Sequence, residues 1–128
     1  MVKIEFITHQ GETILMADFS NSSADEMIDN LKALGEILEN QADHSLLVLE
    51  NMTGVRFDSR VIEAGKQLWS RYKVKLRKIA LVGIEGLKNI VRDDVSQTAQ
   101  LDLPDFPDLE TAKDFLVEKE VAFTENMS

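Results

Sequence analysis

The 128-residue sequence contains no cysteine, only two prolines and few aromatic residues, and it has fewer basic than acidic residues. Without cysteine the chain can form no disulfide, thiolate nucleophile or thiolate-bound metal site, which fits a reducing cytoplasm. Its 14 Lys and Arg residues face 23 Asp and Glu residues, a net charge of −9. This surplus of negative charge disfavours nucleic acid and anionic lipid as partners, because both are themselves negatively charged.

Long apolar runs are also lacking. The longest, at residues 46–49 and 79–84, fall far short of the roughly 20 residues that a membrane helix needs. The N-terminus lacks the apolar block of a signal peptide. We therefore expect a cytoplasmic protein without stable membrane association. The length and the 44% apolar content predict one domain over residues 1–120, followed by a flexible tail over 121–128.

The apolar pattern predicts strands of two kinds. Val2, Ile4 and Phe6 alternate with polar residues, and a second strand over 13–19 is expected to pair with them as an antiparallel hairpin. Residues 46–49 and 79–82 are continuously apolar, which is typical of strands covered on both faces. Residues 101–103 predict a short last strand.

Helix signals separate these strands. Ser23 and Glu26 form a capping-box pattern that predicts a helix over 23–40. Asp58 or Ser59 is expected to cap a second helix, and Asp108 a fourth. The third is expected to carry Leu87, Ile90, Val91 and Val95. The order β-β-α-β-α-β-α-β-α predicts a single α/β domain with a mixed, mostly parallel sheet.

Three segments resemble a known family. The strand at 46–49, followed by Thr53-Gly54-Val55 and by Asp58-Ser59 at a helix start, resembles the central signature of STAS domains. Residues 78–90 and 109–116 are similar to later elements of the stand-alone SpoIIAA-like branch, the bacterial anti-sigma-factor antagonists. The resemblance implies a SpoIIAA-like fold and a non-enzymatic module that binds a protein partner.

In that branch an Asp-Ser-Ser-Gly turn carries a phosphorylated second serine. Here the turn reads Asp58-Ser59-Arg60-Val61, so Arg60 stands at the phosphorylated position and the classical phosphoserine switch is not expected. Ser59 has two interpretations: it belongs to a helix N-cap, or it carries a phosphate between Arg56 and Arg60 at the helix N-terminus. The candidate partner-binding residues at this turn are Thr53, Arg56, Asp58, Ser59 and Arg60.

Trp69 and the charge distribution each allow two interpretations. Trp69 falls at the edge of the apolar arc of the second helix, which predicts a half-buried residue at the core margin or an anchor for a partner. Ten basic and three acidic residues lie between Arg56 and Arg92, a net charge of +7 against −16 elsewhere. Such asymmetry is typical of a solvated helix end, or it favours self-association as a homo-oligomer or an acidic partner.

No catalytic set emerges from the sequence, and we expect no enzymatic activity and no cofactor. His9 and His44 are far apart, with no acid at a metal-ligand spacing, so no metal site is expected. Residues 83–86 lack the phosphate-loop patterns. The alternative to a protein-interaction module is a binder of a small apolar or lipid-like ligand, because STAS-like sheets are similar to the CRAL-TRIO lipid-exchange fold. The candidate lining residues are Met27, Phe57, Trp69 and Phe106.

Overall fold

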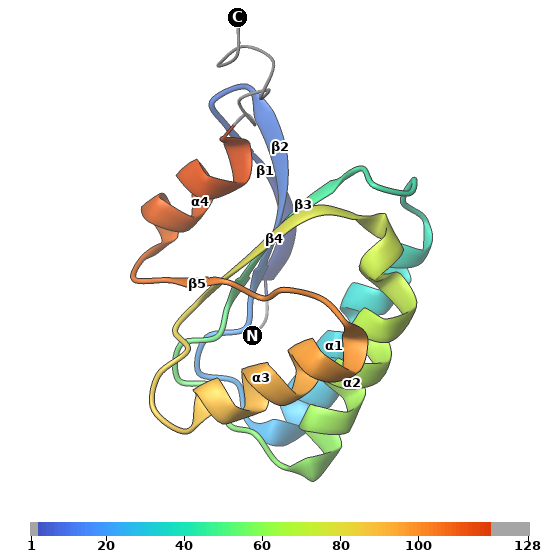
Figure 1. Cartoon of the computed structure of the whole chain (residues 1–128), viewed down its shortest axis with the longest axis vertical. Helices are drawn as coiled ribbons and strands as arrows, with labels where there is room; N and C mark the ends of the chain where they lie inside the picture. Colours follow the sequence, from blue (N-terminus) through green and yellow to red (C-terminus); the bar gives the residue numbers. More distant parts are fainter. Residues whose placement is uncertain (1–2, 119–128) are drawn as a thin grey trace, which may run out of the picture.

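The computed structural model describes residues 3–118, which form one α/β domain (Figure 1). The predicted tail at 121–128 and the end of the predicted domain at residue 120 lie outside these residues. Along the chain, the elements are β1 (Lys3–His9), β2 (Glu12–Asp18), α1 (Ala24–Glu39), β3 (Leu46–Asn51), α2 (Ser59–Tyr72), the 3-10 turn η1 (Lys73–Lys75), β4 (Leu76–Val82), α3 (Lys88–Ala99), β5 (Asp105–Phe106) and α4 (Leu109–Val117). The predicted order of strands and helices is confirmed.

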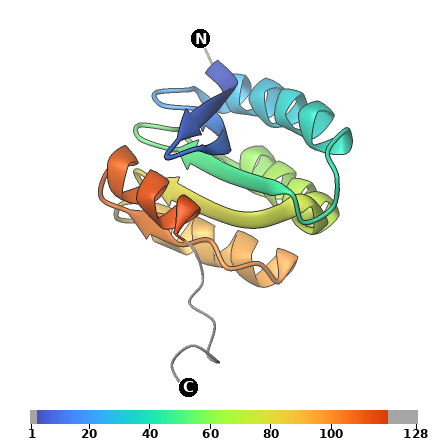
Figure 2. The ribbon, with the colours of Figure 1, turned by 90° about the horizontal axis from the view of Figure 1, so that it is seen from above.

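The five strands lie in the sheet in the order in which they occur in the chain. β1 and β2 form the predicted antiparallel hairpin, and β2, β3, β4 and β5 run parallel. Parallel neighbours require crossover connections, and each of the three connections between β2, β3, β4 and β5 contains a helix. As a result α1, α2 and α3 cover one face of the sheet, while α4 covers the other (Figures 1 and 2).

Strand β3 shows how the sheet divides the core. Successive side chains of a strand point to opposite faces. Leu46 and Val48 therefore pack under the three-helix layer, whereas Leu47 and Leu49 pack against α4. All four are at least 94% buried, which confirms the prediction of a strand covered on both faces. Glu50 continues the first set, so its side chain enters the three-helix face.

The last strand is not where the sequence predicts it. Residues 101–103 pair with no strand, and β5 lies two residues later, between Pro104 and Pro107. Leu103 is only 5% exposed, but its side chain fills the core beneath the helices. An apolar residue next to a sheet edge can thus be buried without any ladder hydrogen bonds, and its pattern imitates that of a strand.

The start of the third helix also differs from the prediction. Leu87 precedes α3 instead of packing inside it, and it is 80% exposed. Ile90 is 67% exposed, and the helix buries Val95 and Ala99. Within residues 3–118 no helix has the length and apolarity needed to cross a membrane.

Candidate functional site

Two loops meet where β3 and β4 end. The Met52 N–H donates to the Val82 carbonyl over 2.7 Å, and the Asn21 N–H donates to the Thr53 carbonyl over 2.8 Å. The backbone of Gly83 also lies against Thr53. Backbone hydrogen bonds from several segments therefore fix the loop at residues 52–57, although it has no regular secondary structure.

Asp58 is the N-cap of α2, which confirms one of the two predicted caps. Its side chain accepts a hydrogen bond from the Val61 N–H over 3.1 Å. Arg60 places one guanidinium nitrogen 2.7 Å from Asp58 and 2.8 Å from Asp25 on α1. The Arg60 hydrogen bond, followed by that from Val61, holds the pKa of Asp58 below its ordinary value. Arg60, which stands where the resembling family carries its phosphorylated serine, is therefore bound by two carboxylates.

Exposed side chains at this end of the sheet define a candidate surface. Lys88 Nζ donates to the Met52 carbonyl over 3.2 Å, so the start of α3 lies beside the 52–57 loop. Leu87 and Ile90, which flank Lys88 closely in the chain, are exposed at this start of α3. We name this region the edge surface; it comprises Thr53, Arg56, Asp58, Ser59, Arg60, Leu87 and Ile90.

The prediction that Trp69 lies half-buried at the core margin is wrong. Trp69 is only 3% exposed, and so it offers no anchor to a protein partner. The reason is that α2 packs between α1 and α3, which cover the edges of its apolar arc as well as the centre. Trp69 is therefore an interior residue and not a partner-binding residue.

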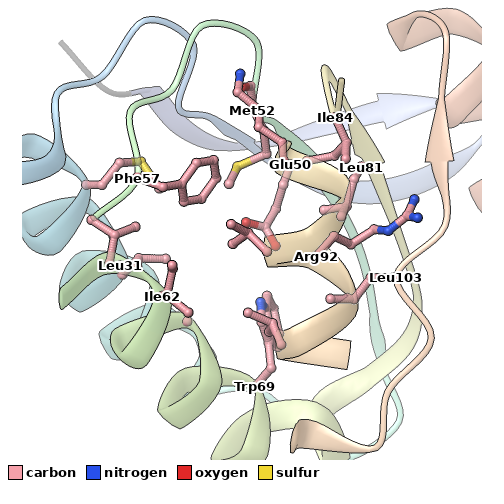
Figure 3. A pocket seen from close by; sticks show the side chains of 16 residues that line it. Leu31, Glu50, Met52, Phe57, Ile62, Trp69, Leu81, Ile84, Arg92 and Leu103 are labelled. Atoms are coloured by element: carbon pink, nitrogen blue, oxygen red, sulfur yellow. The ribbon is translucent and has the colours of Figure 1, made fainter. Parts of the chain in front are cut away.

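Trp69 instead lines a pocket beneath the three-helix layer (Figure 3). The cavity has a volume of about 60 Å³ and is bounded by α1, α2, α3 and the 52–57 loop. Most of its wall is apolar; Met27, Met52, Phe57, Trp69, Val91 and Leu103 contribute to it. We name it the Glu50 pocket, after the one acidic side chain in its wall.

Three of the four predicted ligand-lining residues meet in this pocket, namely Met27, Phe57 and Trp69. Phe106 does not. It lies on the opposite face of the sheet, where its ring centroid is 4.8 Å from that of Phe115 on α4. The prediction for Phe106 is wrong because the sequence predicts the last strand at residues 101–103, whereas β5 is Asp105–Phe106. The face of the sheet to which Phe106 points therefore does not follow from the sequence.

Glu50 is the functional candidate that the sequence analysis missed. Its side chain is 3% exposed and points into the pocket, where the Trp69 indole N–H donates a hydrogen bond to it. Burial raises the pKa of Glu50 to about 7, and the Trp69 hydrogen bond opposes that rise. The pattern did contain a signal: Glu50 follows Leu46 and Val48 at the spacing of two that defines the buried face.

The ten basic residues between Arg56 and Arg92 do not form a uniformly basic surface in three dimensions. Six of these ten cations form salt bridges, and most of the acids involved come from outside residues 56–92. Lys66 pairs with Asp94 over 2.8 Å, for example, and Arg92 pairs with Asp105. The charge asymmetry along the sequence is therefore largely compensated locally by folding.

Comparisons with known proteins establish the fold. No protein-family model and no curated protein matches the chain. An uncharacterised protein of the DUF3478 family with a SpoIIAA-like fold, from Shewanella loihica, matches with a TM-score of 0.68 and 14% identity over 90% of this chain and 93% of that one. An anti-sigma factor antagonist from Mycobacterium paratuberculosis matches with a TM-score of 0.57 and 14% identity over 92% and 96%. The domain thus has the STAS/SpoIIAA-like fold that the sequence resemblance implied.

Proposed function

We propose that the chain is a non-enzymatic, cytoplasmic regulatory module that binds a protein partner through its edge surface. The observation that carries this proposal is the exposure of Leu87 and Ile90, at 80% and 67%, at the end of the sheet that also carries the exposed polar residues Thr53, Arg56, Ser59 and Arg60. Apolar side chains surrounded by polar ones are typical of protein interfaces. The anti-sigma factor antagonist of similar fold supports the same class of function.

The edge surface has the rigidity that such a role requires. Its loop is held by the backbone hydrogen bonds of Met52 and Thr53, and its helix start by the Asp58 cap. A surface that is already ordered loses little conformational freedom when a partner binds. A second copy of the chain is one candidate partner, so self-association remains a prediction.

Site-specific photocrosslinking in the native host tests this function. A photoreactive amino acid in place of Leu87 is expected to give a discrete protein adduct, and Arg56→Glu in the same chain is expected to reduce it. The matched control carries the photoreactive residue at Ala33, which is exposed on α1 away from the edge surface. Equal adducts from both positions, or an adduct that is insensitive to the Arg56 change, would contradict the proposal.

A second candidate function is the binding of a small apolar ligand, and the Glu50 pocket favours it. A volume of about 60 Å³ suits a compact molecule of a few non-hydrogen atoms rather than a lipid chain. Trp69 is the only tryptophan of the sequence, so its fluorescence reports directly on this pocket. Titration with isobutanol is expected to shift the Trp69 emission saturably.

Ile62 offers a way to obstruct the pocket, because it is partly exposed and belongs to the pocket wall. Ile62→Phe is expected to weaken the isobutanol response, whereas Gln67→Phe on the exposed side of α2 leaves it unchanged. The same response from both variants would show that isobutanol does not enter the pocket.

A further inference from the structure

We infer that the Glu50 pocket recognises a small apolar molecule that carries a protonatable amine, and that the Glu50 carboxylate receives this amine. The inference deepens the second candidate function and rests on it. It combines three observations: an acidic side chain buried in an apolar cavity, the small number of hydrogen bonds that it receives, and the occupation of both nearby cations by other groups.

The position of Glu50 is set by the strand. Glu50 lies opposite Leu81 on β4 and Ala17 on β2, so neighbouring strands flank it on both sides. Its side chain therefore extends away from the sheet into the pocket, between α2 and α3 (Figure 3). The rest of the wall is apolar apart from Lys88 and Arg92, and Glu50 is the one acidic group in it that can fix the orientation of a cationic ligand.

The hydrogen bonds of Glu50 leave acceptor capacity unused. An ionised carboxylate offers about four acceptor sites, and the Trp69 N–H occupies one of them. Lys88 and Arg92 are the other ionisable residues in the pocket wall, and both come from α3. Lys88 donates to the Met52 carbonyl, and Arg92 is held by Asp105 and Asp93. Neither forms a salt bridge with Glu50 among the residues that the structure describes.

A ligand ammonium group supplies what the site lacks. Burying a carboxylate that has no cationic partner is costly, and burial accordingly raises the pKa of Glu50 to about 7. A cation beside it favours the ionised form, so the amine binds more strongly as Glu50 loses its proton. The net charge of −9 further favours the approach of a cation.

The test compares three probes of similar shape: isobutylamine, the neutral isobutanol and the anionic isobutyrate. Trp69 fluorescence follows each titration at about pH 8, where Glu50 is mostly ionised and the amine is protonated. We expect isobutylamine to bind the wild type at least about tenfold more tightly than isobutanol. Glu50→Gln, which keeps the shape but removes the charge, is expected to abolish this preference. The matched control Glu63→Gln removes an exposed acid on α2 and is expected to retain it.

A second measurement needs no variant. In the wild type, the preference for amine over alcohol is expected to fall several-fold between about pH 8 and about pH 6, as Glu50 becomes protonated. Amine and alcohol binding equally at both pH values would overturn the role of Glu50 while leaving the apolar pocket intact. Tighter binding of isobutyrate would overturn the amine class and assign the ligand to Lys88 or Arg92. Saturable binding of none of the three would remove the second candidate function itself.

Discussion

Gly83 packs so closely on Thr53 that a Cβ atom on Gly83 would lie 2.4 Å from the Thr53 backbone nitrogen. Gly83 also has a φ of +88°, a conformation that residues with a side chain rarely adopt. Together these constraints place the loop that follows β4 directly against the loop that follows β3. The contact joins the two halves of the edge surface.

Gly83→Ala is therefore expected to destabilise the domain by more than about 1 kcal/mol, measured as the free energy of unfolding in urea. The control is Gly86→Ala. Gly86 also has a positive φ, of +57°, but its Cβ would meet no atom within 4 Å. The control thus carries the backbone strain without the clash. Equal losses in the two variants would contradict the close packing on Thr53.

The pKa of Glu50 predicts how stability depends on pH. Between pH 4.5, the ordinary pKa of a glutamate, and about pH 7, the folded chain keeps a proton on Glu50 that the unfolded chain has lost. The contribution of Glu50 to the free energy of unfolding therefore falls as pH rises through this range, by about 3 kcal/mol in total. Glu50→Gln is expected to gain stability relative to the wild type over the same interval in urea titrations. Glu63→Gln should follow the wild type, and a parallel curve for Glu50→Gln would refute the shifted pKa.

Asp58 and Ser59 are expected to differ in their effect on stability. Asp58→Ala removes both the cap of α2 and the partner of Arg60, so the urea midpoint should fall. Ser59→Ala should leave it almost unchanged, because Ser59 is exposed and Asp58 supplies the cap. A larger loss from Ser59→Ala would reverse the assignment of the cap.

We expect Ser59 to carry no phosphate in protein purified from the native host. A phosphate there would lie beside the Asp58 carboxylate, and Arg60 is already bound by Asp58 and Asp25. Mass spectrometry of the peptide that contains Ser59 provides the measurement. An added phosphate under any of several growth conditions would instead support the second interpretation of Ser59, a phosphate between Arg56 and Arg60.

Self-association driven by charge is expected to weaken as salt rises. Sedimentation equilibrium between about 0.05 M and about 0.5 M salt should show a falling average mass, since screening acts on exposed charges. The change should be small, because six of the ten cations between Arg56 and Arg92 are already paired within the chain. A dimer that resists high salt would indicate an apolar interface instead, and Leu87→Ser would then be expected to dissociate it.

The sequence predicts those elements that carry a clear local signal. The capping box at Ser23 and Glu26 and the buried runs of β3 and β4 are local signals, and the structure reproduces them. Contacts between residues far apart in the chain have no such local signal in the sequence. His9, for example, lies 2.8 Å from Asp114, a residue 105 positions away.

The candidate site shows the same division. Asp58 and the 52–57 loop follow from local pattern, whereas the burial of Trp69 depends on the packing of α3 against α2, a contact between separate elements. Glu50 was within reach, because it occupies a buried register position. The alternation of residues shows that such an acid is buried. It does not show whether the acid faces a cavity or a salt-bridge partner, because that depends on how the side chains pack.

The short strand between Pro104 and Pro107 has a consequence for how copies of this protein meet. Proline lacks an N–H group, so β5 offers few donors to a strand from another molecule. Extension of the sheet by a strand from another molecule is thereby hindered on that side. Any growth of the sheet by a further strand is therefore expected at β1, which forms the opposite edge.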